Sequence, residues 1–379
     1  MYTSKIKAAP PLVRLGHPLA FTTFLRRAGA PVDRYLHRAK LPLLCEDPDS
    51  FVPLMRAWSF FYTAAHHEDP MLGWLVGADI GDNNLNVGLL RKLENSPTLF
   101  RALQRLVAMA GAEASHVEVG IHQRETDVLF YTRYSGMRDV PGYPISQAYQ
   151  LGVFLDLVRY FLGSDWLPQE IGVEHPFDTT VLEKYFPGCR ILTKQHVGYI
   201  SIARNSLHSA PLCAGVNSRV ADGPVQKNLD YLDTLRALLR SYLPDGYPSA
   251  RLAAELMGVS ERTLARRLSA AGLTYGTLVD EVRFEVAKKL LMKQGSRIGD
   301  VAASVGFDDQ ANFTRMFRRV GGLSQYVGAT VAAGVIDGLS VIAEEHASPF
   351  QGAGIGGGPQ LRVRGQEQVQ IDGECPKNQ

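Results

Sequence analysis

The chain has 379 residues, enough for two or three domains that each bury a core, so a single small module is excluded. Hydrophobic residues make up 45% and charged residues 21%, ordinary values that argue against a disordered, collagen-like or membrane-embedded protein. With 40 Lys and Arg against 38 Asp and Glu the net charge is +2, so the chain as a whole lacks the strongly basic character typical of many nucleic-acid binders.

The cysteines are far apart and form no C-x-x-C pair, so neither a zinc ribbon nor a disulfide framework is predicted. They are Cys45, Cys189, Cys213 and Cys375. The most apolar long stretch, residues 327–343, is interrupted by Asp337 and falls short of the roughly 20 apolar residues of a membrane-spanning helix. No apolar run follows the first residues either, so we expect a cytoplasmic protein with no membrane partner.

Residues 1–220 mix helical and strand patterns. Apolar residues recur at helical spacing between about 21 and 106. The three predicted apolar faces are Phe24, Leu25 and Ala28; Leu54, Trp58, Phe61 and Tyr62; and Leu99, Leu103 and Leu106. Alternation on both sides of a polar turn predicts a hairpin over 117–131. An apolar helix and two short strands follow, at 145–162, 171–174 and 198–202, which completes an α+β domain.

The rest of the chain divides into three segments. Residues 221–229 are polar and contain Asp222-Gly-Pro, which predicts a linker. Residues 230–326 have helical periodicity throughout and are predicted to form an all-α domain. Residues 327–379 include a glycine-rich run at 352–359, and we expect this tail to be partly disordered.

The all-α region contains a repeat with an offset of 49 residues, the spacing from Ser260 to Asp309. The matched apolar pairs are Leu252 and Val301, Ala253 and Ala302, Leu256 and Val305, Leu264 and Phe313, and Leu268 and Phe317. Ser260 and Asp309 stand where a side chain can cap a helix, and Gly258 precedes the first of them. Each copy is therefore predicted to be a helix, a tight turn and a second helix.

A helix-turn-helix binds DNA when its second helix presents hydrogen-bond donors to the major groove. The outward polar residues of the two second helices are Arg262, Thr263, Arg266 and Arg267 in the first copy and Gln310, Asn312, Thr314 and Arg315 in the second. Arginine can pair with guanine, and glutamine or asparagine with adenine. The expected base contacts are Arg262, Arg266, Gln310 and Arg315. The other four are expected to support these contacts or to bind phosphate.

One amphipathic helix is predicted between the two copies, because apolar residues recur every four positions. They are Leu278, Val282, Val286 and Leu290, with Val279, Ala287 and Leu291 beside them. Some 20 residues would span roughly 30 Å. This approaches the roughly 34 Å of one duplex turn, so one chain could place both second helices in successive major grooves.

Residues from about 230 to 319 resemble the DNA-binding domain of the AraC/XylS family of bacterial transcription regulators. The shared patterns are Arg283-x3-Ala287-x2-Leu290-Leu291, Ile298-x2-Val301-Ala302-x2-Val305-Gly306-Phe307, and Phe313-x3-Phe317-Arg318-Arg319. The resemblance implies double-stranded promoter or operator DNA as the partner, a place on the nucleoid, and base-reading positions at Arg262, Ala265, Arg266, Gln310, Ala311, Thr314 and Arg315. Ala265 and Ala311 could touch only a thymine methyl group. After the second copy, Gly322-Leu-Ser-Gln-Tyr-Val327 lacks the family's proline and arginine.

The N-terminal region resembles the arabinose-binding-like effector domain of one branch of that family. The resemblance lies in Trp166-Leu-Pro-Gln-Glu-Ile-Gly-Val-Glu-His-Pro176, Tyr185-Phe-Pro-Gly188 and Ser206-Leu-His-Ser-Ala-Pro-Leu212. It implies that the domain senses a small-molecule effector or a partner, or dimerises. A homodimer and a contact with RNA polymerase are further expectations of the resemblance.

Other motifs are weaker. Residues 82–88 have alternating Asp and Asn as in a calcium loop, but Val87 and Leu93 stand where that loop needs Gly and Glu. His116, Glu118 and His122 share a strand face and could hold a metal, although an exposed polar face is by far the more common meaning of such a pattern. The aromatic run of Trp58, Phe60, Phe61 and Tyr62 could line an apolar ligand pocket, but such clusters usually form core.

The chain has no G-x-S-x-G elbow, H-E-x-x-H pair or catalytic cysteine signature, so no enzyme, cofactor or metal is predicted. Two alternatives remain open: a metal-dependent enzyme domain fused to a DNA-binding module, and a ligand-independent regulator acting through protein contacts. Residues 251–319 contain 12 Lys and Arg against 8 Asp and Glu, a surplus of +4, which leaves the rest of the chain at −2. This modest surplus predicts weak, salt-sensitive non-specific binding to DNA.

Overall fold

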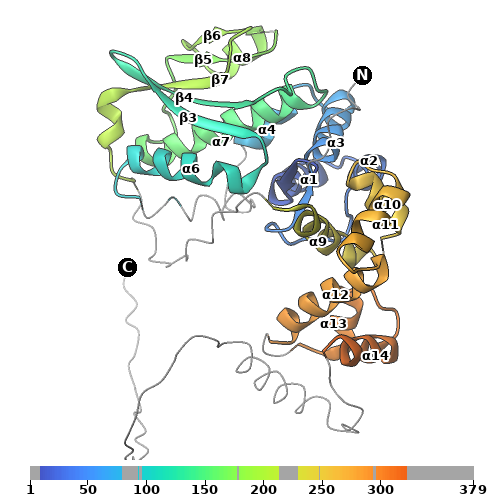
Figure 1. Cartoon of the computed structure of the whole chain (residues 1–379). Helices are drawn as coiled ribbons and strands as arrows, with labels where there is room; N and C mark the ends of the chain where they lie inside the picture. The colour runs from blue at the N-terminus through green and yellow to red at the C-terminus, as the bar shows by residue number, and fades with distance from the viewer. Residues whose placement is uncertain are drawn as a thin grey trace, which may run out of the picture. The chain divides into compact units, whose positions relative to one another are not determined.

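A computed structural model describes most of the chain (Figure 1). The described residues are 9–78, 93, 96–176, 179–212, 229–246, 248–292 and 296–321. The predicted tail, most of the predicted linker, the loop at 82–88 and the glycine-rich run at 352–359 lie outside them. Among these residues, no helix has the length and apolar character needed to cross a membrane.

The first part of the described chain, residues 12–67, is mainly helical and also contains a two-stranded sheet. β1 (Leu12–Arg14) pairs antiparallel with β2 (Phe51–Pro53), and the segment between them forms α1 (Gly16–Arg27) and α2 (Val32–Ala39). α3 (Leu54–His67) continues directly from β2. Neither strand is predicted from the sequence, because three residues are too few to show alternation.

The predicted apolar face of α3 is correct except at its edge. Leu54, Trp58 and Phe61 are buried, whereas Tyr62 is 49% exposed, so its place on this face is corrected. Position 62 lies eight residues after Leu54, about 80° further round the helix, at the margin of the apolar stripe. A tyrosine tolerates this margin because its ring has one polar end.

A five-stranded sheet with the order β3-β4-β7-β5-β6 follows. Its strands are β3 (Val117–Gln123), β4 (Asp127–Tyr134), β5 (Glu170–Gly172), β6 (Arg190–Leu192) and β7 (Gly198–Ala203). The predicted hairpin is β3–β4, with Val117 opposite Tyr134 and Gln123 opposite Val128. β7 is antiparallel to both β4 and β5, and β5 is parallel to β6. The strands predicted near 171–174 and 198–202 are therefore confirmed as β5 and β7.

Helices pack against one face of this sheet (Figure 1). The helices of this part are α4 (Leu72–Ala78), α6 (Leu99–Glu113), α7 (Tyr143–Leu162) and α8 (Thr179–Tyr185), with a 3-10 helix at Arg204–His208. α7 is the predicted apolar helix. α4 approaches α7 closely because Gly77 has no side chain: a Cβ there would lie 2.5 Å from the carbonyl oxygen of Tyr149.

From residue 229 onward the described chain is helical, as predicted. The helices are α9 (Tyr231–Tyr242), α10 (Ala250–Leu256), α11 (Glu261–Ala270), α12 (Tyr275–Leu291), α13 (Ile298–Ser304) and α14 (Gln310–Val320), with a 3-10 turn at Leu243–Asp245. The protein therefore has an α+β N-terminal region followed by an all-α region.

Two hydrophobic cores hold the structure together. The first contains Phe21 and Trp58 from the N-terminal helices together with Leu238 and Leu264 from α9 and α11. The second lies between the sheet and α6 and α7, where the rings of Phe130 and Phe154 are 4.2 Å apart between centroids. The first core thus runs without interruption from the N-terminal helices into the first helix-turn-helix copy.

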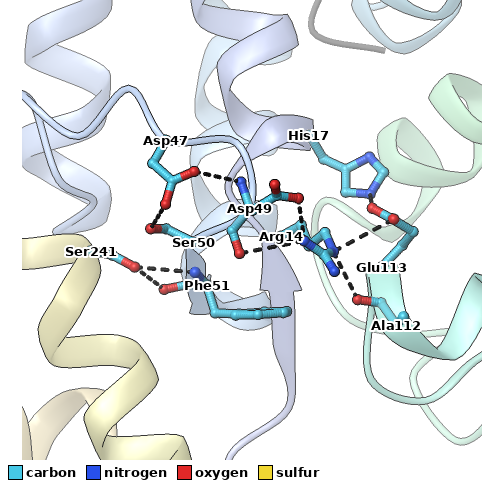
Figure 2. Close-up of polar contacts among 9 residues, drawn as sticks. All are labelled: Arg14, His17, Asp47, Asp49, Ser50, Phe51, Ala112, Glu113 and Ser241. Carbon is cyan, nitrogen blue, oxygen red and sulfur yellow. Dashed lines mark hydrogen bonds and ion pairs between the residues drawn. The ribbon is translucent and has the colours of Figure 1, made fainter. Parts of the chain in front are cut away.

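Polar contacts fix α9 against the N-terminal region. The Ser241 hydroxyl donates to the Phe51 carbonyl at 2.5 Å and accepts from the Phe51 N–H at 3.1 Å, as Figure 2 shows. The Tyr242 hydroxyl donates to the carbonyl of Lys40 at 2.7 Å. The two carboxylate oxygens of Asp245 accept from the backbone N–H groups of Leu43 and Leu44, each at 2.6 Å.

An ion-pair cluster joins α10 to the same region. Lys40 and Arg56 each lie 2.7 Å from a carboxylate oxygen of Glu255. The hydrogen bond from Lys40 and the proximity of Arg56 lower the pKa of Glu255 below its ordinary value. The contact therefore stabilises the fold above the ordinary carboxyl pKa and is lost as the pH falls through the lowered one.

A buried arginine, Arg283 on α12, holds the second helix-turn-helix copy. Its Nε donates to the carbonyl of Val305 at 3.0 Å, and its Nη2 donates to the carbonyl of Gly306 at 2.9 Å. The guanidinium also lies 4.3 Å from the centre of the Phe307 ring. Arg283 is 8% exposed, so it satisfies the carbonyls at the end of α13 in a site closed to water.

Glu170 on β5 is a buried carboxylate surrounded by donors. The Tyr199 hydroxyl donates to it at 2.7 Å, Arg124 lies 3.1 Å away, and Arg190 forms a second ion pair. Burial alone would raise the pKa of Glu170, but hydrogen bonds from Tyr199, Arg190 and Arg124 lower it instead.

We expect Glu170→Gln to reduce the free energy of unfolding at neutral pH by about 1–3 kcal/mol, because charge-assisted hydrogen bonds are lost. The difference from the wild type should shrink as the pH falls below the ordinary carboxyl range, where wild-type Glu170 is protonated in the unfolded chain and then in the folded one. Urea unfolding at several pH values measures this. A difference that stays constant down to acidic pH would contradict the account.

We expect Arg283→Ala to release the second copy, because two carbonyls lose their donor in a buried site, at a cost of about 2–4 kcal/mol. Limited proteolysis should cleave this variant within residues 296–321 much faster than the wild type. Lys289→Ala, which changes an exposed residue on the same helix, is the matched control. Equal cleavage rates for the two variants would show that Arg283 is not the anchor.

Candidate nucleic-acid interface

The two second helices, α11 and α14, begin where the repeat predicts. The Ser260 hydroxyl accepts from the N–H of Thr263 at 3.2 Å and caps α11. The Asp309 carboxylate accepts from the N–H groups of Ala311 and Asn312, at 3.0 and 3.2 Å, and caps α14. Both predicted caps are therefore confirmed, and each fixes the start of a helix that carries candidate DNA-binding residues.

The turn before each second helix needs a residue with positive φ. Gly258 has a φ of +67° at the end of α10, and Gly306 has a φ of +75° at the end of α13. A side chain on Gly306 would also lie 3.0 Å from the carbonyl oxygen of Leu243. Gly258 is the glycine that the sequence places at such a turn, and Gly306 has the same position in the second copy.

α11 presents a basic surface to solvent. Leu264 and Leu268 are 1% exposed, which anchors the helix in the first core. Arg262 and Arg266 lie on the exposed side, and no ion pair joins either of them to another described residue. Ala265 is also exposed on this side, and its side chain is only a methyl group. Two guanidinium groups are thus available to a ligand.

The other two candidates on α11 make contacts within the protein. The Thr263 hydroxyl lies 2.9 Å from the Ser260 hydroxyl, so it takes part in the cap. The Arg267 guanidinium lies 4.3 Å from the centre of the Tyr231 ring on α9, which is a cation–π contact. Arg267 is half-buried, unlike Arg262 and Arg266, and differs from the outward position expected of it.

α14 presents a second polar surface. Phe313 and Phe317 are buried. The ring centroid of Phe317 lies 4.7 Å from that of Phe284 on α12, with the two rings tilted. The side chains of Gln310, Asn312 and Arg315 are exposed, and Arg315 donates to the side-chain oxygen of Asn312. The Thr314 hydroxyl donates to the Gln310 carbonyl at 2.8 Å. Free hydrogen-bonding capacity on this helix lies mainly with Gln310, Asn312 and Arg315.

α12 joins the two copies and is shorter than expected. It has 17 residues, which span about 25 Å rather than the roughly 30 Å that the sequence suggests. Thr274 and Thr277 form a reciprocal capping box at its start. Asp280 on α12 forms an ion pair with Arg319 on α14, and Arg236 on α9 lies 3.4 Å from Glu281.

Sequence reasoning missed the structural role of Arg283. It named the residue as part of a family pattern and gave it no contact. A local signal was present: Val279, Arg283 and Ala287 are four residues apart, so Arg283 stands on the apolar face of the helix. A charged residue at a core position requires buried partners, which here are the carbonyls of Val305 and Gly306.

Two cavities lie among the described residues of the N-terminal region that carry the predicted aromatic run. One, of about 60 Å³, is lined by residues that include Trp58, Phe61 and Glu113. The other, of about 290 Å³, is lined by residues that include Tyr62 and Trp74. Of the predicted aromatic run, Trp58 and Phe61 therefore line one cavity and Tyr62 the other, while Phe60 is fully buried.

The three predicted metal candidates are not brought together as a metal site. Glu118 forms an ion pair with Arg133 at 2.7 Å and accepts from the Tyr131 hydroxyl at 3.2 Å. His116 precedes β3 in a backbone conformation with a φ of +64°. Within the part of the chain that the structure describes, no three His, Cys, Asp or Glu residues are grouped so that they could hold a metal ion.

Two family models match the chain, in separate segments. Residues 29–209 match the arabinose-binding domain found at the N-terminus of AraC transcription regulators, and residues 253–324 match a helix-turn-helix domain. The second segment contains α11, α12 and α14 and all eight candidate DNA-binding residues.

Curated relatives match over a quarter of the chain or less. The transcriptional regulator VqsM of Pseudomonas aeruginosa is 37% identical over 82 residues, 22% of this chain and 25% of that protein. The ornithine utilization regulator of the same organism is 36% identical over 95 residues, 25% of this chain and 27% of that protein. VirS of Mycobacterium tuberculosis is 33% identical over 87 residues, 23% of this chain and 26% of that protein. The chain thus covers about a quarter of the length of these relatives.

Among solved structures, the transcriptional regulator CdpR from Pseudomonas aeruginosa is similar at 19% identity and a TM-score of 0.34, over 77% of this chain and 94% of that one. The order of the two matched domains, arabinose-binding type first and helix-turn-helix second, is the arrangement that the sequence resemblance predicts. The chain belongs to the AraC/XylS family of transcription regulators.

Proposed function

We propose that the protein is a sequence-specific DNA-binding transcription regulator. The observation that carries this proposal is the pair of capped helices, α11 and α14, each anchored on its apolar side and presenting hydrogen-bond donors on the other. This is the geometry of a helix that enters the major groove. Membership of the family and the matches to named regulators support the same role.

Within this proposal the eight candidates divide by their surroundings. Arg262 and Arg266 read bases on one half-site, and Gln310 and Arg315 read bases on the adjacent one. Asn312 supports Arg315, which already donates to it. Thr263, Arg267 and Thr314 already bond or stack within the protein and position the helices, with any DNA contact of theirs directed to phosphate.

The remaining parts of the proposal concern regulation. Residues 1–220 sense a small-molecule effector, residues 221–229 link, and residues 230–326 bind DNA. The protein acts on promoter DNA in the cytoplasm and regulates transcription rather than catalysing a reaction. A homodimer and contact with RNA polymerase fit a DNA-binding half whose surplus is only +4, because a second subunit or partner adds the affinity that the charge does not supply.

The test uses a DNA duplex whose sequence the protein protects in genomic footprinting. We expect Arg266→Ala to weaken binding to this duplex by about 1–3 kcal/mol at fixed salt, because a bidentate guanine contact is lost. Arg101→Ala removes the same charge from an exposed position on α6 and is the matched control. Fluorescence anisotropy measures both. If the two variants bind as tightly as the wild type, Arg266 is not a base contact.

We expect the two copies to read separate half-sites. In hydroxyl-radical footprints, Arg266→Ala should reduce protection on one half of the site, and Arg315→Ala should reduce it on the other, about one helical turn away. The reason is that α11 and α14 are held apart by α12. Loss of protection over the same bases in both variants would contradict a two-site arrangement.

A further inference from the structure

The smaller cavity lies where the two hydrophobic cores meet. Its walls include Trp58 and Tyr149 from the first core and Leu106 and Phe154 from the second. Protein interiors are packed as densely as organic crystals and contain few voids larger than a water molecule. The cavity here, of about 60 Å³, is larger than a water molecule, partly open to solvent and lined mainly by apolar atoms, so it offers a small apolar molecule a place to enter.

Trp58, one of the residues that line the cavity, has an unsatisfied donor. Trp58 is fully buried, and its indole N–H has no acceptor among the described residues. An indole nitrogen can only donate. A buried donor without an acceptor is unfavourable, so a molecule that brings an oxygen acceptor into the cavity gains by supplying the missing bond.

The charged groups at the cavity are already paired. His17 Nε2 lies 3.6 Å from a carboxylate oxygen of Glu113, and His17 Nδ1 lies 3.3 Å from the Tyr149 hydroxyl. Arg14 Nε lies 3.5 Å from the other oxygen of Glu113. A ligand with its own charge would enter an apolar space with no free counter-charge among these groups, so the chemistry favours an uncharged ligand.

A ligand of ring size has to widen the cavity. A cavity of about 150 Å³ holds benzene, which is more than twice the volume present here. Trp58, Tyr149 and Phe154 are at most 3% exposed and belong to the packed cores, whereas the side chains of His17 and Glu113 are 18% and 16% exposed. His17 and Glu113 therefore belong to the less buried part of the lining, where widening disturbs the packed cores least.

That part of the lining is connected to α9 of the DNA-binding half. Arg14 Nε donates to the Ala112 carbonyl at 3.1 Å beside Glu113, and the Arg14 guanidinium lies 5.2 Å from the centre of the Phe51 ring. The backbone of Phe51 holds Ser241 on α9 by two hydrogen bonds. Figure 2 marks the polar contacts that join His17, Glu113 and Arg14 and, separately, those between Phe51 and Ser241; the contact of Arg14 with the Phe51 ring links the two sets.

We propose that this cavity is the effector site, that its ligand is a small uncharged molecule, mainly apolar with one oxygen acceptor, and that binding is transmitted to α9 through Arg14, Phe51 and Ser241. The proposal deepens the proposed function and rests on it for its regulatory part. Ligand binding to the cavity is measured without DNA. A failure of the proposed site is therefore distinguishable from a failure of the proposed DNA-binding function.

The binding test uses benzyl alcohol as the probe, with benzylamine and benzoate as charged molecules of similar size. Calorimetry on the full chain should show binding of the alcohol at millimolar concentration and much weaker binding of both charged probes. Ala110→Leu fills the cavity and should abolish binding. Trp58→Phe removes the donor and should weaken binding about fivefold to tenfold. Trp74→Phe, in the larger cavity, is the matched control and should have no effect.

No binding of the alcohol, equal binding of all three probes, or sensitivity to Trp74→Phe rather than Trp58→Phe would overturn the site. Circular dichroism checks that each variant is folded. Because Ala110→Leu could disturb packing, the comparison of the two tryptophan variants keeps the test decisive.

The transmission test compares DNA affinity with and without benzyl alcohol. In the wild type the alcohol should change the Kd for DNA about fivefold or more. In Ser241→Ala it should bind with unchanged affinity but leave the Kd for DNA unaltered, whereas the exposed Ser164→Ala should respond like the wild type. A response that persists in Ser241→Ala would overturn the route through Phe51.

Discussion

The constraint on which the rest of the structure depends is the shared core between the N-terminal helices and the first helix-turn-helix copy. Leu238 on α9 and Leu264 on α11 pack in the same cluster as Phe21 and Trp58. Burial of apolar side chains is the dominant stabilising contribution in such a cluster, and close packing makes it rigid. A displacement of the N-terminal helices must therefore move α9 as well, which is the physical requirement for regulation through this contact.

The two copies are held in different ways. The first is part of the large core and is additionally fixed by Ser241, Tyr242 and Asp245 through hydrogen bonds to the N-terminal region. The second depends on α12 through Arg283 and the rings of Phe284 and Phe317. One copy is thus directly linked to the N-terminal region, and the other follows it through a single helix of 17 residues.

The elements that sequence predicted well have a repeated or periodic pattern. The offset of 49 residues located both caps, and alternation located β3 and β4, because these signals lie within one segment. The contacts that connect distant segments had no local signal. Arg14 on β1 meets Glu113 on α6, and Ser241 on α9 meets Phe51 on β2, only because these distant segments pack together. Arg267 was expected to face outward because the helical pattern shows a position and not the Tyr231 ring beside it.

The central claim is that one chain recognises two adjacent DNA half-sites through α11 and α14. Selection of bound duplexes from a random pool at physiological salt, followed by sequencing, tests it most directly. The account predicts enrichment of two different short motifs separated by about one helical turn. Enrichment of a single motif, or of none above the level of non-specific binding, would contradict it.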